Sequence, residues 1–295
     1  MKNAMSVKID KKTLFFLIAP GLIIYVFVVI VPLFTALGYS FTDWSIGPNK
    51  HFIGLGNYIK LVKDNIFWSS LKNNLIIVFA NVIVQMGIAF LLTVLLTSKH
   101  TRFKTLHRTV IFLPVVLSAV VVGYIWQMIY SNDYGILNAV LSMIGLGYLV
   151  KPWLDSPQIV IFSVTVPLIW QYLGIPLIIF MSAVQGISRE IYEVCELDGV
   201  TGIQKARYIT FPLIFDSIKV TVMLSISSNM LVFTHIYVLT GGGPGTSSMV
   251  LAQYAYNTSF VSMKLGYGSA ISIGIFVISF AIVILFRKLT EVKVK

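Results

Sequence analysis

Six long apolar segments, free of ionised side chains away from their ends, limit what this sequence can fold into. They cover residues 13–36, 73–97, 109–130, 158–183, 217–239 and 265–286. About 20 apolar residues in an α-helix cross the hydrocarbon core of a bilayer. Only 11% of the residues are charged, against about a quarter in a soluble domain. The sequence predicts an all-α membrane protein with six transmembrane helices in one domain, residues 1–295.

The distribution of lysine and arginine predicts the orientation of this domain. Sixteen of the 22 basic residues lie at the two termini, between the second and third segments, and between the fourth and fifth segments, if Lys219 at the start of the fifth segment is counted with the last group. By the positive-inside rule, both termini and these loops are cytoplasmic. The cations form no single patch. The net charge of +11 is therefore interpreted as a signal of membrane topology, and no nucleic-acid partner is expected.

The first segment follows a basic head and could be confused with a signal peptide. Its apolar stretch is longer than a secretory core and no small-residue cleavage site follows it, so it is expected to be a retained helix. The single cysteine, Cys195, has no partner for an intrachain disulfide.

The apolar segments lack the groups that would let the chain energise transport alone. Ion-coupled carriers usually hold ionisable side chains in the membrane, and the one candidate, His235, is expected to be structural. The sequence has no phosphate-binding loop, no Cys-x-x-Cys and no hydrolase motif. An enzyme is therefore not supported, and an ion-coupled secondary carrier is the less favoured alternative.

Uncharged polar and aromatic side chains inside the segments suggest a path for a neutral, hydroxyl-rich solute. Any one of them could equally join two helices by hydrogen bonds. Two clusters are the strongest candidates. They consist of Trp170, Gln171, Tyr172, Gly174 and Pro176 in the fourth segment, and of Ser225 and Asn229 in the fifth.

A short charged stretch, residues 188–212, separates the fourth and fifth segments. Ser188 is placed to cap a first helix, and Gly199 to end it in the left-handed conformation. Thr201 and Gln204 have capping-box spacing for a second helix. The first helix is amphipathic, so it either lies on the membrane or docks to a cytoplasmic protein.

The same stretch resembles the Glu-Ala-Ala-x3-Gly-x9-Ile-x-Leu-Pro pattern of the permease subunits of ATP-binding-cassette (ABC) importers. Glu193, Gly199, Ile209 and Pro212 match the pattern at its fixed offsets. The pattern's two alanines and its leucine are replaced here by Val194, Cys195 and Phe211. The resemblance implies that the following residues couple the chain to an ATPase: Glu193, Val194, Cys195, Asp198, Gly199, Ile209 and Pro212.

Further motifs along the chain resemble the carbohydrate-importer permeases, in particular the type of the larger maltose permease and of the multiple-sugar and glycerol-phosphate permeases. These motifs are Ala19-Pro20, Ser40-Phe41-Thr42-Asp43-Trp44, the stretch 52–58, and Leu239-Thr240-Gly241-Gly242-Gly243-Pro244. The resemblance implies the type I importer fold in a bacterial or archaeal cytoplasmic membrane.

The resemblance also implies the partners of the chain. They are a second, homologous permease, an ATPase dimer that binds ATP and Mg²⁺, an extracytoplasmic solute-binding protein and the lipid bilayer, while this chain itself binds no cofactor. The expected substrate is a neutral sugar or oligosaccharide, with glycerol-3-phosphate or a polyol as the alternative. In the maltose-type subunit the solute site lies on the helices that flank the coupling loop, and by position in the family pattern this site corresponds here to the region around Gly174 and Pro176 and to Asn229.

Overall fold

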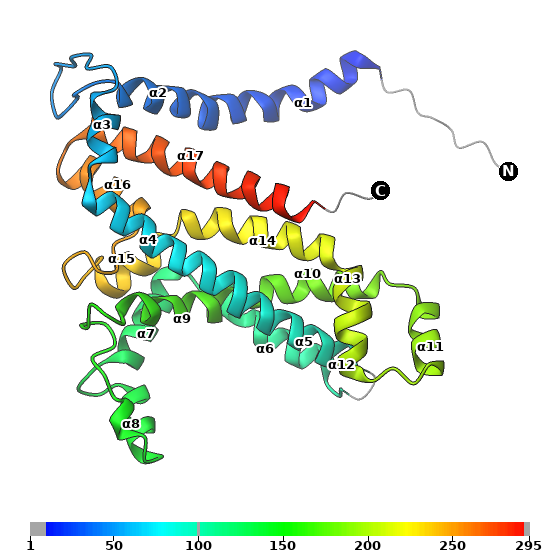
Figure 1. Cartoon of the computed structure of the whole chain (residues 1–295). Coiled ribbons are helices and arrows are strands. Elements are labelled where there is room, and N and C mark those ends of the chain that lie inside the picture. Colours follow the sequence, from blue (N-terminus) through cyan, green and yellow to red (C-terminus); the bar gives the residue numbers. More distant parts are fainter. Residues whose placement is uncertain (1–9, 99–100, 292–295) are drawn as a thin grey trace. The chain divides into compact units, whose positions relative to one another are not determined.

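The computed structural model describes residues 10–98 and 101–291, which are almost entirely helical (Figure 1). The only strand-like pairing in these ranges is one isolated bridge between Thr42 and Phe52. The all-α prediction is therefore confirmed for the described residues. The chain divides into two compact units. Unit 1 holds Met1–Lys63 and Thr258–Ile273, and unit 2 holds Asp64–Asn257 and Gly274–Lys295.

Unit 1 is dominated by one long apolar helix, built from α1 (Lys11–Tyr25), η1 (Val26–Ile30) and α2 (Val31–Ser40). Because Pro32 has no N–H to donate into the preceding turn, the helix widens into the π turn of η1 just before it. The unit also contains α3 (Gly56–Val62) and the first part of α17 (Leu265–Thr290).

Unit 2 carries the remaining helices together with the last part of α17. In chain order they are α4 (Asn65–Ala80), η2 (Asn81–Gln85), α5 (Met86–Thr97), α6 (Lys104–Val116), α7 (Ala119–Tyr130), α8 (Ile136–Met143), η3 (Gly147–Leu149), α9 (Val160–Tyr172), α10 (Gly174–Gln185), α11 (Arg189–Leu197), α12 (Gly202–Lys205), η4 (Ala206–Thr210), α13 (Phe211–Leu213), α14 (Phe215–Met230), α15 (Thr234–Thr240) and α16 (Leu251–Tyr256). Among these, η3 is a 3-10 helix. The π-helix η5 (Asn257–Val261) follows α16 and, from Thr258 on, belongs to unit 1.

Three helices in the described ranges are long and apolar enough to cross a membrane. The number of candidate spans rises to six if each of three bent helix pairs is counted as one span. The continuous ones are Lys12–Ser40, Asn65–Thr97 and Leu265–Thr290. The pairs are α6 with α7, bent by 100°, α9 with α10, bent by 44°, and the helix Gly202–Leu213 with α14, bent by 71°.

Each of the segments 109–130, 158–183 and 217–239 contains a break and is not one continuous helix. The first is interrupted after Val116, where the Ser118 side chain caps the new helix α7. The second bends where Pro176 has no N–H to donate. The third ends its helix at Met230, and α15 starts only at Thr234.

Buried side-chain amides satisfy the backbone carbonyls that these helix ends leave free. Asn74 donates to the carbonyls of Asn229 (2.9 Å) and Met230 (3.3 Å) at the end of α14, and its Oδ1 accepts from the N–H of Leu251 (2.8 Å). Asn73, one residue earlier, donates to the carbonyls of Ser247 and Met249. The last carbonyls of a helix have no intrahelical partner. Two adjacent side chains of α4 therefore hold both the end of α14 and the stretch 247–251 in place.

An apolar core surrounds these amides. It is formed by buried residues of α4, α9 and α15 and of the loop before α16. They are Ile77, Val160, Ile161, Val164, Leu168, Ile236, Leu239 and Val250.

Replacing Asn74 by alanine should lower the melting temperature of the purified protein in detergent. Each buried backbone group left without its hydrogen-bond partner costs about 1–3 kcal/mol of stability. The substitution removes the partner of the Leu251 N–H and of the carbonyls of Asn229 and Met230 at once. Asn65→Ala, on an exposed position of the same helix, is the matched control. Equal melting temperatures for the two variants would contradict this role of Asn74.

Candidate functional site

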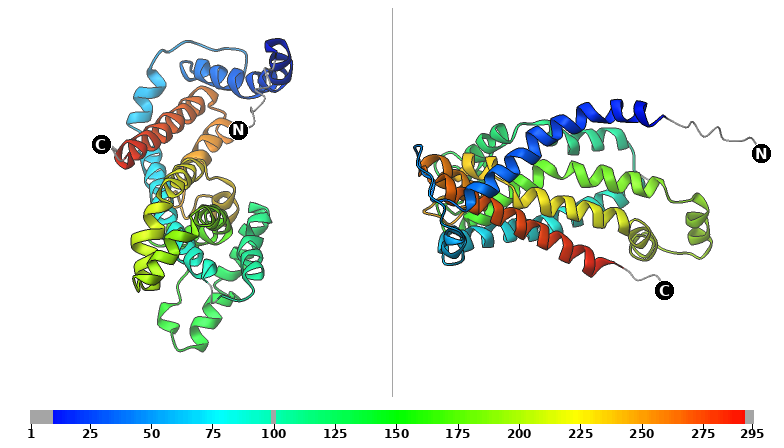
Figure 2. Two further views of the ribbon diagram at one scale, coloured as in Figure 1. Left: turned by 90° about the vertical axis from the view of Figure 1, so that its right-hand side faces the viewer. Right: turned by 90° about the horizontal axis from the view of Figure 1, so that it is seen from above.

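The stretch 188–212, here called the arm, projects from one end of unit 2. Figure 1 shows α11 standing apart from α10 and α14, and Figure 2 (right) shows the same yellow-green helix at the end of the unit. The arm begins where Ser188 accepts a hydrogen bond from the N–H of Glu190 (3.3 Å). It returns to the bundle through α12, η4 and α13.

The turn between the two helices of the arm has the geometry that its sequence predicts. Gly199 has a φ of +67°. The Val200 N–H donates to the Cys195 carbonyl (3.0 Å) and the Gly199 N–H to the Glu196 carbonyl (3.3 Å), which is the Schellman arrangement. The left-handed end of α11 is therefore confirmed.

The second helix of the arm is capped as expected. The Gln204 side chain accepts from the backbone N–H of Thr201 (2.9 Å) and from its hydroxyl (2.8 Å). Lys205 reaches back to α11, with its Nζ 3.9 Å from a carboxylate oxygen of Glu196 and 5.4 Å from the ring centre of Tyr192. Exposed pairs of this kind are weak singly, but together they link both helices of the arm.

The arm presents an apolar surface to its surroundings. Leu197 is 87% exposed and Ile203 is 83% exposed, and Val194 is also exposed. Neither Leu197 nor Ile203 belongs to the family pattern, so neither was predicted. Leu197 ends α11 and Ile203 lies in the first turn of α12, so the two exposed side chains flank the turn at Gly199, here called the tip of the arm.

The residues predicted to couple the chain to an ATPase do not share one face. Glu193, Val194, Asp198, Gly199 and Pro212 are exposed, and Ile209 is half-buried. Cys195 is buried, so it points away from its neighbour Val194. Cys195 therefore supports the turn from inside, while Val194 lies on the outer surface.

The first predicted solute-path cluster lies where several helix breaks meet. Gln171 is buried, donates to the carbonyl of Leu117 (2.8 Å) at the α6–α7 break, and shares a 2.5 Å hydrogen bond with His235 at the start of α15. The Tyr172 ring packs edge-on against His235, at 5.7 Å between ring centres. His235 was expected to be structural, and its burial and hydrogen bond agree with that expectation.

Trp170 and Gly174 have different surroundings in the same cluster. Trp170 is partly exposed and packs edge-on against Trp126, with ring centres 5.9 Å apart. A Cβ at Gly174 would lie 2.8 Å from the Cα of Phe112, so glycine permits close packing of α10 on α6. Pro176 is buried beside it.

The second cluster forms a compact unit on α14. The Asn229 amide nitrogen donates to the carbonyl (2.8 Å) and the hydroxyl (3.1 Å) of Ser225, and both side chains are buried. These contacts leave the amide nitrogen engaged within the helix. The structure thus brings Gln171 and Tyr172 to His235, and Asn229 to Ser225 and Asn74.

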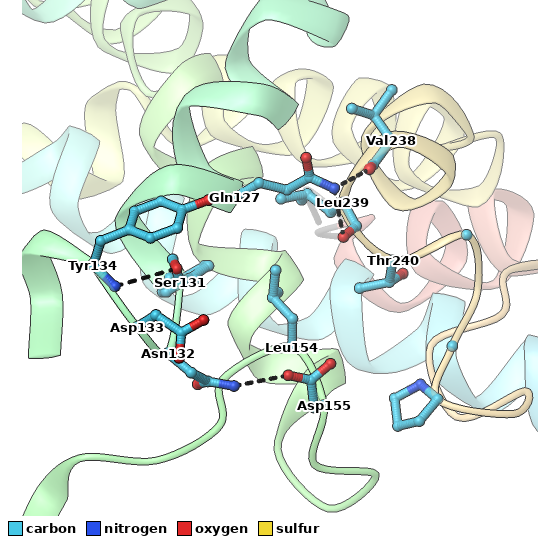
Figure 3. A pocket seen from close by; sticks show the side chains of 14 residues that line it. Gln127, Ser131, Asn132, Asp133, Tyr134, Leu154, Asp155, Val238, Leu239 and Thr240 are labelled. Atoms are coloured by element: carbon cyan, nitrogen blue, oxygen red, sulfur yellow. Dashed lines mark hydrogen bonds between the residues drawn. The ribbon is translucent and has the colours of Figure 1, made fainter.

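A polar hollow that no sequence motif predicts lies at the end of unit 2 away from the arm (Figure 1) and is seen from close by in Figure 3. It has a volume of about 640 Å³ and is lined by the ends of α7 and α15, by the loops after them, and by Leu154 and Asp155 before α9. Gln127 donates to the carbonyls of Val238 (2.8 Å) and Leu239 (3.2 Å), and Asn132 donates to Asp155 (2.9 Å). Its residues come from three separate stretches, so no local motif could reveal it.

In the described ranges, no group of three or more His, Cys, Asp or Glu side chains is placed to hold a metal ion.

Comparison with known proteins assigns the chain to a family. Residues 85–291 match the family model described as the binding-protein-dependent transport system inner membrane component. The probable ABC transporter permease YurN of Bacillus subtilis is 35% identical over 90% of this chain and 91% of that protein. The multiple sugar-binding transport system permease MsmF of Streptococcus mutans is 31% identical over 94% of each chain.

A solved structure shares the fold. A chain in the crystal structure of a bacterial alginate ABC transporter, in complex with an alginate pentasaccharide-bound periplasmic protein, superposes with a TM-score of 0.82 at 22% identity. The match covers 94% of this chain and 93% of the other. The chain belongs to the inner-membrane components of binding-protein-dependent transport systems, as a multi-pass permease subunit of the type I carbohydrate ABC importers and not an enzyme.

Proposed function

We propose that this chain is one of two permease subunits that import a neutral sugar or oligosaccharide, driven by ATP hydrolysis on separate subunits. The observation that carries the proposal is the arm, an exposed, rigidly capped helix pair in a chain with no phosphate-binding loop of its own. The family description supports a solute-binding protein as a further partner. A type I importer of this kind places the arm and both termini in the cytoplasm.

In this function the arm inserts its apolar tip into a cleft of the ATPase. Leu197, Ile203 and Val194 supply the apolar surface, and Glu193 the polar anchor. Movement of the ATPase dimer is passed to α14 and α10 because the arm is hydrogen-bonded at both helix ends. ATP and Mg²⁺ bind to the ATPase and not to this chain.

The solute follows a path beside the partly exposed Trp170, with the Ser225–Asn229 pair on α14 as the second element. An indole face suits the apolar face of a sugar ring, and neutral amides and hydroxyls suit its hydroxyl groups. An anionic substrate such as glycerol-3-phosphate would call for a cation within the six apolar segments. The only basic residue there is Lys219, near one end, and it pairs with Asp216 at 2.6 Å.

The names of relatives support a carbohydrate substrate. MsmF of Streptococcus mutans is named for multiple-sugar transport, and the structural neighbour handles alginate, which is acidic. The preference for a neutral sugar over an acidic one therefore rests on this chain's own charge distribution.

Gly199→Ala should weaken the functional contact with the ATPase. Both Gly199 and Gly202 have open space around an added Cβ, but only Gly199 has a left-handed φ. Alanine in that conformation costs about 1–2 kcal/mol, which reduces the population of the native turn by about 5–30-fold. In proteoliposomes with all partners, solute-stimulated ATPase activity should fall for Gly199→Ala and stay unchanged for Gly202→Ala.

Full solute-stimulated ATPase activity in Gly199→Ala, or an equal loss in both glycine variants, would remove the proposed role of this turn. Copurification of the ATPase with each variant separates failed assembly from failed coupling.

Trp170→Ala should slow sugar uptake without changing ATP hydrolysis in the absence of sugar, because it removes a ring face from the solute path. Phe79→Ala, at an exposed aromatic position of α4, serves as the control. Uptake is measured in proteoliposomes at saturating, sugar-loaded binding protein. Wild-type uptake by Trp170→Ala would exclude this residue from the path.

The substrate class is tested with the binding protein that works with this permease. Neutral oligosaccharides should raise its melting temperature and then drive uptake through the assembled importer. Uronic-acid oligosaccharides or glycerol-3-phosphate should do neither. Uptake driven by an acidic solute alone would overturn the neutral-sugar proposal.

A further inference from the structure

The short helix α8 presents an apolar stripe that nothing in its own unit covers. Ile136, Val140, Met143 and Ile144 are all exposed, with Met143 84% exposed. Their spacing of four, seven and eight residues places them on one face of the helix. The stripe is therefore a continuous apolar surface and not a set of scattered side chains.

The stretch around α8 is also uncharged. Residues 134–150 contain no Asp, Glu, Lys or Arg, and Asp133 and Lys151 stand at its two borders. The nearby polar hollow shows the contrast, since it carries Asp133 and Asp155. A surface that faces water, or that forms the rim of a protein–protein interface, normally carries charged side chains. A surface that contacts the hydrocarbon of a bilayer excludes them.

The opposite face of α8 is fixed to the rest of unit 2. Asn138 accepts a hydrogen bond from the indole N–H of Trp153 (2.7 Å), and Trp153 packs near the ring of Tyr130 at 6.1 Å. Tyr130 ends α7 and is buried. The apolar stripe is therefore held outward by a defined contact on its other side.

The direction of α8 differs from that of the spanning helices. Figure 1 shows α8 below α7, at the end of unit 2 away from the arm, with its axis roughly vertical in the view while α9, α10 and α14 run roughly from left to right. Spanning helices lie within some tens of degrees of the membrane normal. A helix that crosses their direction runs along the membrane plane.

Exposed apolar side chains also continue from α7 into α8. Tyr124 and Met128 are exposed on α7, which belongs to one of the membrane-spanning pairs.

We propose that α8 is an interfacial anchor that lies in the outer leaflet, with its stripe against the acyl chains of the lipids. Its partner is the lipid surface itself. Tyr148, exposed just after the helix, is placed at the headgroup level where aromatic rings gather, and Lys151 can reach lipid phosphates. The anchor fixes the outer end of α7 and, through Trp153, the wall of the polar hollow.

Spin labelling in bilayers tests this placement. Single cysteines replace Met143, on the stripe, and Ser142, an exposed residue on the opposite face of the same helix, in a Cys195→Ala background. The assembled importer is reconstituted in phosphatidylcholine–phosphatidylglycerol nanodiscs. Oxygen should relax the Met143→Cys label several-fold more than a water-soluble nickel complex does, because oxygen concentrates in hydrocarbon. The ratio should invert for the Ser142→Cys label.

Two other results would overturn the proposal. If nickel reaches the Met143→Cys label as readily as the Ser142→Cys label, the stripe faces water. If the Met143→Cys label is immobilised and shielded from both reagents, the stripe is covered by protein. Repeating that measurement with and without the binding protein then separates a binding-protein contact from a contact with the second permease.

Discussion

A helix that ends inside a membrane leaves carbonyls that water cannot reach, and the arrangement of this chain depends on how those carbonyls find donors. Side-chain amides supply the donors at several of the helix ends described above. Asn74 caps α14, Gln171 caps α6 at Leu117, and Gln127 caps α15. In unit 1 the Asn57 side chain donates to the carbonyl of Ser40 at the end of α2. Each amide comes from a different helix than the one it caps, so each of these hydrogen bonds is also a tertiary contact.

This constraint explains why the polar interior serves structure first. Gln171 and Asn229 lie in the clusters expected to line a solute path, yet their amide nitrogens bond to protein oxygens. Trp170 keeps part of its ring exposed. The proposed path is therefore formed by ring faces and small polar groups on a frame whose geometry is held by the buried amides.

The arm obeys a different physical rule, because it stands outside the apolar core. Its shape is set by local bonds within about a dozen residues: the Schellman turn at Gly199 and the Thr201–Gln204 cap. Local bonds of this kind are encoded by residue type and spacing, which is why the sequence predicted them correctly. The direction of each side chain depends on packing, so the burial of Cys195 beside the exposed Val194 could not be predicted.

Hydropathy, capping and glycine act over short distances, so the sequence alone predicts a helical membrane protein, the positions of its apolar segments and the turn of the arm. Gly174 and Pro176 in the segment 158–183 are also local signals of a helix break. The breaks in the segments 109–130 and 217–239, the pairing of each amide with a helix end, and the positions of the polar hollow and the stripe of α8 follow from the tertiary structure. Asn74 and Leu251 are far apart in the sequence but share a hydrogen bond of 2.8 Å. Such pairs depend on how helices pack, and no local pattern of residues specifies that packing.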